Sequence, residues 1–578
     1  MNMNIHKYIL LAGAAALLAG CEDEVLPTNV LTNEQVANMP AAQEGMLNGI
    51  TSFMVSYNAW GASEETSYYT NDWGYPCQML FRDVCTADMP VYDTSYNYWS
   101  WVEAGDESRY LPYYTYKYYY KLVRNCNNLI SVVDPATATT ASRHNLGCAL
   151  VFRALAYLDM ARMFEYRRTG IPSIDSKADA EGIWGLTVPL VTEATTMEQA
   201  KQNPRLPFYH MYRFILTDLN HAEQYLADYE RPDKNLPDLS VVYGMKARFW
   251  MEVGTRFELN PDDLSTQLAR EAEATDGYDN LGIGSAADCF RLALDYARRA
   301  YANYAPITEE QWYDKATGFN TPNQSWMWAM TVKSREQIPG QYYNSFMGVM
   351  ATEPEWSMCR AYKAYRMIGS SLYAAIPLDD WRRHSWVGPA DAGRVESKSS
   401  YSTSLSDEQW VATPAYANLK FRPAQGNLTD YYLGLLVSLP QMRAEEMAFI
   451  EIEALARLNG YMAGAEALKN FVSVNRMNGA PLNLPELYGY EDFQREMMLQ
   501  KRIEFWGEGL VFFDYKRLAL QVDRSVNVNT PELHRLRSVA GYVAPWMNYY
   551  ILEYEREFNT AVKPNPDTSG VIKATTTD

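Results

Sequence analysis

The sequence predicts a mainly α-helical protein, in which tetratricopeptide-like helical pairs form a scaffold with long irregular loops and a few short strands. Apolar residues recur at helical spacing in one segment after another. The predicted helices come in neighbouring pairs, as in αα-hairpins. The stretches between them are rich in Gly, Pro, Ser, Asn and aromatic residues. No repeat of about 34 residues is visible, so the helical units must have diverged from one another.

The clearest helices carry one apolar stripe each. The first stripe comprises Leu146, Leu150, Ala154, Leu155, Leu158 and Ala161, and it ends before the break at Gly170-Ile171-Pro172. The second comprises Phe208, Met211, Ile215, Leu219, Ala222 and Leu226. A shorter helix at about 241–253 follows across a turn with Pro232 and Pro237, which predicts an αα-hairpin. Further helices are expected at about 286–303, 440–458, 463–476 and 491–506.

Three long regions show no helical pattern, at about 60–112, 171–205 and 304–435. Loops of this length in a compact protein are usually functional. Within the third region, Trp326 and Trp328 alternate with Met327 and Ala329 in a strand-like run. We therefore expect at least one of these two tryptophans to lie in the core.

Composition narrows the class of protein. The chain has 578 residues, 47% of them hydrophobic, and a formal net charge of −19. It can bury a large core, and the negative charge argues against a nucleic-acid partner, because such binding depends on cationic contacts with phosphates. Tyr outnumbers Phe by 44 to 19, with 15 Trp besides. Tyr and Trp carry a polar group on an aromatic ring, and such residues are common at surfaces and interfaces.

The N-terminus reads as an export signal. Lys7 precedes an uncharged run from Tyr8 to Gly20, too short for a spanning helix of roughly 20 residues but typical of a signal peptide. The run ends in Leu17-Leu18-Ala19-Gly20-Cys21, which resembles the lipobox of bacterial lipoproteins. We therefore expect residues 1–20 to be removed and Cys21 to carry covalent lipid such as palmitate. The alternative is an ordinary secretory signal with a chance cysteine.

The remaining chain is divided accordingly. Residues 21–35 open with Glu22-Asp23-Glu24 and are expected to form a lipidated flexible tether, and residues 36–578 a single domain. No second long apolar run follows, so the membrane contact expected is the lipid anchor alone, stable when more than one acyl chain is attached. Six cysteines remain besides Cys21: Cys77, Cys85, Cys126, Cys148, Cys289 and Cys359. Cys77 and Cys85 are the candidates for a disulfide that lie closest together in sequence. We favour mostly free, buried thiols, because a chain this long does not need disulfide bonds for stability.

Several blocks of sequence, in order along the chain, resemble the SusD/RagB-like family of outer-membrane nutrient-binding lipoproteins. The strongest lies at 499–518, where the matching positions are Arg502, Glu504, Phe505, Glu508, Gly509, Phe513, Asp514 and Arg517. Upstream, the helix pattern of the family is matched by Arg443, Glu445, Glu446, Glu451, Glu453 and Ala454. Asn475-Arg476 resembles a short turn of the family, although Asn478 replaces its second arginine. In the N-terminal half, 125–130, 153–157 and 170–172 resemble the first helical pair.

The resemblance implies a single SusD-like domain over 36–578, in which these charged residues belong to the scaffold. Unpaired buried charges are costly, so we expect Arg502, Glu504 and Asp514 to form buried ion pairs and caps. The resemblance also implies that the loops at about 60–112 and 304–435 hold the function. There the protein would cap a SusC-like TonB-dependent barrel at the outer membrane, facing the cell exterior, and bind its cargo.

Candidate ligand-binding residues follow from the chemistry of sugars, whose apolar faces stack on aromatic rings while polar side chains bind their hydroxyls. The best candidates are Tyr96, Asn97, Tyr98, Trp99 and Trp101. Tyr342 and Tyr343, in an expected turn after Pro339-Gly340, are a second pair. The alternative is that such rings pin the loops to the helices, as is expected of Tyr113 to Tyr120, and of Trp356, Trp381 and Trp386 taken singly.

Signals for catalysis are weak. The sequence has no H-E-x-x-H, no G-x-S-x-G and no Walker loop. The turn at 276–280 offers oxygens to calcium but lacks EF-hand spacing, so a solvated turn is favoured and no cofactor is expected. The favoured hypothesis is a non-catalytic lipoprotein that captures a polysaccharide or oligosaccharide for its transporter. A surface glycoside hydrolase, which needs only two carboxylates, and a helical-repeat scaffold stay as alternatives, and the cargo is open between glycan, glycopeptide and peptide.

Overall fold

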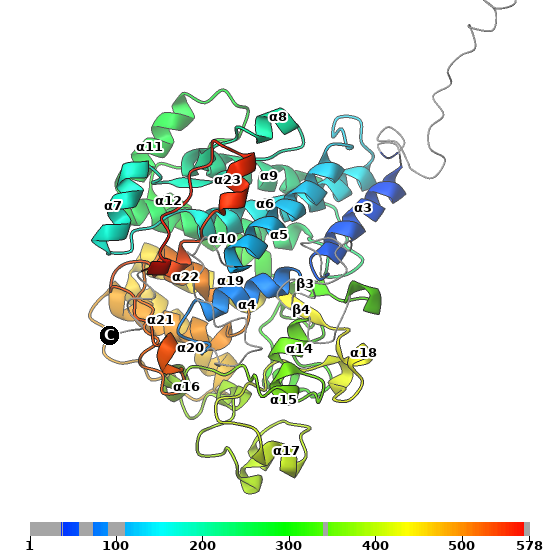
Figure 1. Ribbon diagram of the computed structural model, residues 1–578, viewed down its shortest axis with the longest axis vertical. Coiled ribbons are helices and arrows are strands. Elements are labelled where there is room, and N and C mark those ends of the chain that lie inside the picture. Colours follow the sequence, from blue (N-terminus) through cyan, green and yellow to red (C-terminus); the bar gives the residue numbers. More distant parts are fainter. Residues whose placement is uncertain (1–35, 37–38, 57–72, 91–109, 339–344, 571–578) are drawn as a thin grey trace, which may run out of the picture.

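The computed structural model describes residue 36 and residues 39–56, 73–90, 110–338 and 345–570. The fold is mainly α-helical, with two small two-stranded sheets in these ranges, and this confirms the predicted fold class. The long helices occupy the upper part and centre of Figure 1, and a lower part carries short helices joined by irregular chain.

The long helices pack in a continuous series. In chain order the first are α3 (Pro40–Phe53), α4 (Tyr75–Val84), α5 (Tyr110–Ile130), α6 (Thr140–Phe164), α9 (Phe208–Tyr225), α10 (Leu239–Leu259) and α12 (Ala286–Tyr301). They continue as α19 (Ala444–Asn459), α20 (Tyr461–Arg476) and α21 (Tyr490–Glu504). From α5 each of the later helices contacts the next, in the order α5, α6, α9, α10, α12, α19, α20, α21. The expected helical pairs are therefore present and stack on one another.

Local sequence sets where these helices begin. Thr139 caps α6 by accepting a hydrogen bond from the Ser142 amide, and Asp238 caps α10 by accepting one from the Val241 amide. The helix expected at 241–253 is accordingly longer at both ends. Proline opens α7 (Pro172–Glu181) and α11 (Pro261–Ala272) at the first helical position, where its missing N–H is not needed.

The remaining helical elements are short. The α-helices among them are α8 (Met197–Ala200), α13 (Glu309–Tyr313), α14 (Phe346–Met350), α15 (Met358–Ala361), α16 (Ser370–Ala375), α17 (Asp407–Val411), α18 (Tyr431–Gly434), α22 (Val511–Arg517) and α23 (Glu553–Phe558). The 3₁₀ turns are η2 (Arg335–Gln337), η3 (Trp381–Ser385), η4 (Val395–Ser400), η5 (Ala424–Gly426), η6 (Glu532–His534) and η7 (Pro545–Met547).

Both sheets are antiparallel pairs. Strand β1 (Leu186–Pro189) pairs with β2 (Arg205–Pro207), and β3 (Trp326–Thr331) pairs with β4 (Ser438–Arg443). Trp326 and Trp328 are both fully buried, so the expectation that at least one lies in the core is confirmed. The helix expected from about 440 was wrong at its start, because 438–443 is paired with β3 and α19 begins only at Ala444.

All three regions expected to be irregular contain regular elements among the described residues. Helix α4 lies within 60–112, and α7, β1 and α8 lie within 171–205, with β2 beginning at its end. The short helices α13 to α18 and strand β3 lie within 304–435. All ten residues of α4 are buried, and this includes the polar Gln78, Arg82 and Asp83, so the polar face of this helix packs inside the protein and does not face solvent.

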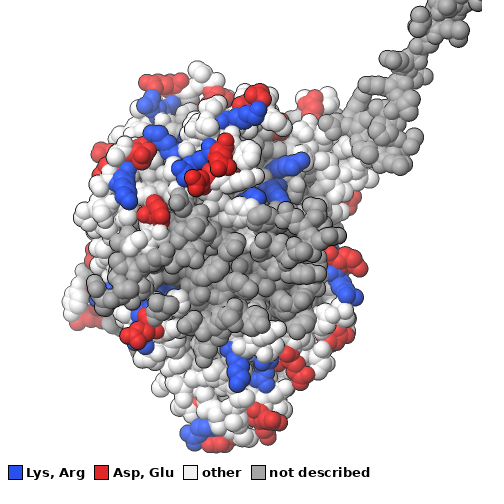
Figure 2. Space-filling view, in the orientation of Figure 1, with Lys and Arg blue, Asp and Glu red and all other residues white. Residues whose placement is uncertain are grey.

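The expectation for the cysteines is confirmed, since Cys77, Cys85, Cys126, Cys148, Cys289 and Cys359 are all free and buried. In the described ranges no helix has both the length and the apolar character needed to cross a membrane. The predicted signal peptide and tether, including Cys21, lie outside the described residues. On the face seen in Figure 2, acidic and basic side chains of the described residues are interspersed.

Candidate functional site

The predicted ligand-binding residues lie outside the described residues. Tyr96, Asn97, Tyr98, Trp99 and Trp101 fall in 91–109, and Tyr342 and Tyr343 fall in 339–344. They stay predictions, and the structure contributes the positions of the residues that flank these segments.

Residues on either side of 57–72 meet at the end of α3. The Tyr75 amide donates a hydrogen bond to the Met54 carbonyl at 2.8 Å. Gly74 has φ +83°, and a Cβ at this position would lie 2.3 Å from the Met54 oxygen. A glycine is required here, because only glycine combines this backbone conformation with so close an approach. The residues just before and just after segment 57–72 are therefore in direct contact.

Residues that flank 339–344 lie at the same place. Gln337 donates from Nε2 to Ser52 Oγ at 3.0 Å, near the end of α3. The Trp73 and Phe346 rings meet edge to face, with centroids 6.2 Å apart. The residues that flank 57–72 and those that flank 339–344, which are far apart in the sequence, thus lie side by side near α3 and α14.

The residues just before 91–109 are held by the C-terminal part of the chain. Arg502 on α21 binds the Asp88 carboxylate at 2.5 Å, and Trp506 Nε1 donates to the Asp88 carbonyl at 2.9 Å. After the segment, α5 is held by its tyrosines: the Tyr118 ring stacks on Phe53 with centroids 5.2 Å apart. This confirms that the tyrosines at 113–120 serve to pack the helix.

The charged residues of the family pattern form a buried network around Glu504. Its carboxylate accepts hydrogen bonds from Arg382 at 2.9 Å, from Arg443 at 3.1 Å and from Arg476 at 2.8 and 3.0 Å. Arg443 also binds Glu508. All of these side chains are at most 2% exposed. The prediction that Glu504 serves the scaffold is confirmed.

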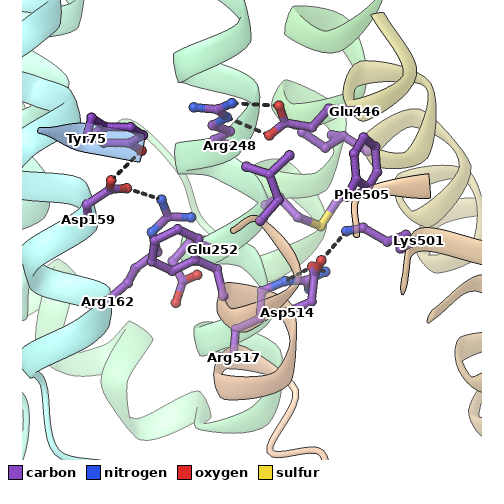
Figure 3. A pocket seen from close by; sticks show the side chains of 14 residues that line it. Tyr75, Asp159, Arg162, Arg248, Glu252, Glu446, Lys501, Phe505, Asp514 and Arg517 are labelled. Atoms are coloured by element: carbon purple, nitrogen blue, oxygen red, sulfur yellow. Dashed lines mark hydrogen bonds and ion pairs between the residues drawn. The ribbon is translucent and has the colours of Figure 1, made fainter. Parts of the chain in front are cut away.

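A second set of buried charges surrounds a small cavity between α6, α10, α19 and α21, shown in Figure 3. Arg248 binds Glu446 through two hydrogen bonds of 2.6 Å, and Lys501 binds Asp514 at 2.5 Å. The cavity has a volume of about 50 Å³. This suits a few water molecules and is far below the roughly 300–1,000 Å³ of ligand pockets. These charges therefore join helices and leave no room for a sugar.

The other tryptophans weighed as ligand contacts are structural. Trp356, Trp381 and Trp386 are buried. The Trp381 ring meets Trp312 edge to face at 5.2 Å, and Trp386 meets Trp506 at 5.6 Å. The expectation that each belongs to the core is confirmed.

The turn at 276–280 is fastened by polar side chains of α9. Arg213 binds Asp276 at 2.8 Å, and His210 Nδ1 lies 3.3 Å from the same carboxylate. Asp279 accepts a hydrogen bond from Asn220 at 2.7 Å. Among the described residues no group of three or more His, Cys, Asp or Glu side chains is placed to hold a metal ion. The favoured interpretation of a turn agrees with these contacts.

Sequence reasoning did not single out an open pocket of about 410 Å³ between the C-terminal end of α10, the start of α11, α22 and the chain on either side of α7. Trp184, Phe208 and Tyr542 contribute aromatic surface to it, and polar side chains complete its lining. Its residues come from distant segments, near 165–185, 208, 256–263, 516–519 and 541–543, so no local motif marks it.

Comparison with known proteins adds a family model that matches part of the chain. Residues 81–251 match the sequence model of a SusD-like family described as starch-binding associating with outer membrane. No curated protein matches the chain.

Solved structures match over nearly the whole length. A SusD-like carbohydrate binding protein from Bacteroides vulgatus ATCC 8482 is 18% identical, with a TM-score of 0.63, and the match covers 90% of this chain and 97% of that one. A SusD superfamily protein from the same organism is 12% identical, with a TM-score of 0.62 and coverage of 92% and 99%. Surface glycan-binding protein A from Bacteroides thetaiotaomicron is 14% identical, with a TM-score of 0.57 and coverage of 91% and 98%.

At these identities the solved structures establish the fold, and the family match adds sequence likeness over residues 81–251. The chain therefore has the fold of these SusD-like structures along nearly its whole length, and residues 81–251 match the sequence model of a SusD-like family.

Proposed function

We propose that this protein is a non-catalytic lipoprotein on the outer face of the outer membrane, where it captures a polysaccharide or oligosaccharide and delivers it to a SusC-like TonB-dependent transporter. The observation that carries the proposal is the likeness in fold, over nine-tenths of the chain, to solved proteins described as carbohydrate-binding and glycan-binding. The starch-binding description of the family matched by 81–251 supports it.

The N-terminal sequence supports the location. Leu17-Leu18-Ala19-Gly20-Cys21 ends a short apolar run, and acylation of Cys21 by more than one chain would anchor the protein stably. The flanks of 57–72 and 339–344, anchored side by side, support a common surface for the two loop regions in which binding is predicted.

Binding without turnover can be measured on the unlipidated mature protein, residues 22–578. We expect retention in affinity gels that contain the right polysaccharide, with no new reducing ends after long incubation. Release of reducing ends that is abolished by one carboxylate substitution would favour the surface glycoside hydrolase. Absence of affinity on glycan, glycopeptide and peptide arrays alike would favour the helical-repeat scaffold.

The transporter partner can be tested in the native membrane. A tagged form of the protein, purified in mild detergent, should bring with it a large TonB-dependent barrel. Purification of the tagged protein without such a barrel would contradict this part of the proposal.

The predicted site can be tested with Trp99→Ala and Trp101→Ala. If these rings stack on sugar, each change should weaken glycan binding by about tenfold, since stacking of an aromatic ring contributes on the order of 1 kcal/mol or more. Tyr488→Ala, at an aromatic residue with 78% of its surface exposed, is the matched control and should leave binding unchanged. Folded Trp99→Ala and Trp101→Ala variants with unaltered affinity would remove these residues from the site.

A further inference from the structure

The open pocket between the C-terminal end of α10, the start of α11, α22 and the chain on either side of α7 has the properties of a second ligand site. Helices α7 and α11 lie at one edge of the molecule in Figure 1, with α22 below them. The volume of about 410 Å³ falls within the range of small-molecule pockets. Its polar lining includes five cationic side chains, at Arg167, Arg168, Arg256, Lys516 and Arg517, against the carboxylates of Glu165 and Asp263. This local excess of positive charge occurs in a chain whose net charge is −19.

Two of these cations are committed to carboxylates. Arg256 binds Glu165 through hydrogen bonds of 2.6 and 2.8 Å and lies 2.8 Å from Asp263. Arg517 is paired with Glu453 and Asp514 on the side of the buried network. The positive charge that remains for a ligand therefore comes from Arg167 and Arg168, and the buried amine of Lys516 also lines the pocket.

Arg167, Arg168 and Lys516 have weak or distant carboxylate partners. Arg167 lies 3.5 Å from Glu165, which already binds Arg256. Arg168 lies 3.4 Å from Asp179, and both side chains are more than half exposed, so this pair contributes little in water. No carboxylate of the described residues lies within ion-pair distance of Lys516 Nζ, which donates to the Met163 carbonyl at 2.6 Å.

Hydrogen bonds to their backbone groups hold Arg167 and Arg168 in place. Asn548 accepts a hydrogen bond from the Arg167 amide at 2.9 Å and donates one to the Arg167 carbonyl at 2.8 Å. The Val543 amide donates to the Arg168 carbonyl at 3.0 Å. The Arg168 guanidinium lies 4.2 Å from the centroid of the Trp184 ring, which is itself fixed by a 2.8 Å hydrogen bond to Asp179. The arginines are thus presented by a rigid backbone, as a specific site requires.

An aromatic face completes the pocket. Tyr542 packs so closely on Gly170 that a Cβ there would lie 2.6 Å from its ring, yet 40% of the tyrosine surface is exposed. A ring with one packed side and one open side is suited to the apolar face of a sugar.

We infer that this pocket is an acidic-sugar subsite, which binds a carboxylate-bearing sugar residue with the carboxylate at Arg167 and Arg168 and the sugar ring against Tyr542. The inference rests on the proposed function and deepens it, because it names the class of glycan that the protein takes. Arginine is suited to this role, since its planar fork matches the two oxygens of a carboxylate. Burial also lowers the pKa of Lys516 well below its ordinary value, and a bound anion beside it would favour the charged amine.

The test compares matched ligands on the mature protein, residues 22–578. Methyl glucuronoside and methyl galacturonoside are titrated by ligand-observed NMR against their uncharged methyl esters, which keep the ring and remove the charge. We expect the acids to bind about tenfold more tightly than the esters, since hydrogen bonds between charged groups contribute more than neutral ones.

Variants locate the binding. The double change Arg167→Gln and Arg168→Gln should remove the preference for the acid, and Arg168→Gln alone, at a side chain 55% exposed, should weaken it without risk to folding. Tyr542→Ala should weaken acid and ester together. Arg291→Gln, at an arginine 64% exposed on α12, is the matched control and should change nothing.

The inference is overturned if acids and esters bind equally, if neither binds, or if the folded arginine variants keep the preference. In each of these cases retention of the protein by neutral polysaccharide gels would leave the proposed function standing. Loss of all glycan affinity would instead overturn the proposed function itself.

Discussion

Glu504 is the residue at which three arginines from different parts of the chain meet. Arg382 comes from η3, Arg443 from the end of β4 and Arg476 from the end of α20. The carboxylate is fully buried, so its charge is compensated by these guanidiniums and not by water. A buried pair of this kind adds little over an apolar core, but loss of one partner leaves the other charges uncompensated.

We therefore expect Glu504→Gln to lower the free energy of unfolding by about 3–5 kcal/mol, measured by chemical denaturation. Glu198→Gln is the matched control, because Glu198 is 81% exposed and pairs with Lys201 on the surface. Its effect should stay below about 1 kcal/mol. Equal, small effects of the two changes would contradict the role given to Glu504.

The same carboxylate predicts a pH dependence. Burial alone would raise its pKa, but Arg476 and Arg443 hold the pKa of Glu504 well below the ordinary value of 4.5. Because the folded pKa lies below the unfolded one, the ionised group stabilises the fold above the unfolded pKa, and this contribution is lost as the pH falls.

The difference in unfolding free energy between wild type and Glu504→Gln should thus be full near neutral pH and should narrow below about pH 4.5. Denaturation curves of both proteins across this range measure it. A difference that stays constant down to pH 3 would show that the pKa of Glu504 is not depressed.

At the scale of elements, Gly509 links the block at 499–518 to helix α4. Its amide donates to Asp83 Oδ2 at 3.1 Å, and its carbonyl accepts from Arg82 Nε at 2.8 Å. Its φ is +69°, and a Cβ would lie 2.5 Å from the Met79 Cα atom. The glycine of the Glu508-Gly509 pair is therefore required by backbone conformation and by the close approach of α4.

Gly509→Ala should destabilise the protein by more than the roughly 1–2 kcal/mol of a left-handed backbone alone, because the added methyl group would collide with the α4 backbone. Gly479→Ala serves as the control, since Gly479 has φ +89° but no atom within 4 Å of the Cβ position. Thermal melting of both variants gives the comparison. A loss for Gly509→Ala no larger than for Gly479→Ala would argue against close packing of α4.

Two of the correctly predicted helices, α9 and α12, have one apolar stripe and a polar opposite face. Helix α9 buries Met211, Ile215 and Leu219 on such a stripe, and α12 buries Phe290, Ala293 and Ala297. Helix α11 escaped prediction because the residues it buries, Gln267 and Glu271, are polar. An apolar period cannot reveal a helix whose buried side chains are held by hydrogen bonds.

At the scale of the whole molecule, we predict that the lipid anchor at Cys21 does not contribute to the stability of the folded domain. Cys21→Ser should release the protein from the membrane fraction, because no acyl chain would be attached, while the melting temperature of the soluble body should stay the same. Cys289→Ser, at a buried thiol on α12, is the matched control and should remain membrane-bound. Membrane fractionation with a salt wash measures both, and a Cys21→Ser protein that still pellets would contradict lipidation at this residue.

The candidate site is known only in part from the sequence. Local composition predicted seven ligand-binding residues, which stay predictions: Tyr96, Asn97, Tyr98, Trp99, Trp101, Tyr342 and Tyr343. The pocket near Arg167 and Tyr542 was visible only in the structure. Arg167 and Tyr542 are separated by hundreds of residues, and no pattern in either neighbourhood indicates that they meet.

The sequence alone predicted the helical pairs, an export signal and a resemblance to a known family, because each prediction depends on residues close together in sequence: an apolar period, a short apolar run, a spaced pattern of charges. The tertiary structure decided which charged side chains form ion pairs and where the surface has pockets. Arg82 reaches Gly509, 427 positions away, and such contacts depend on distances in space that only the packing of the helices sets.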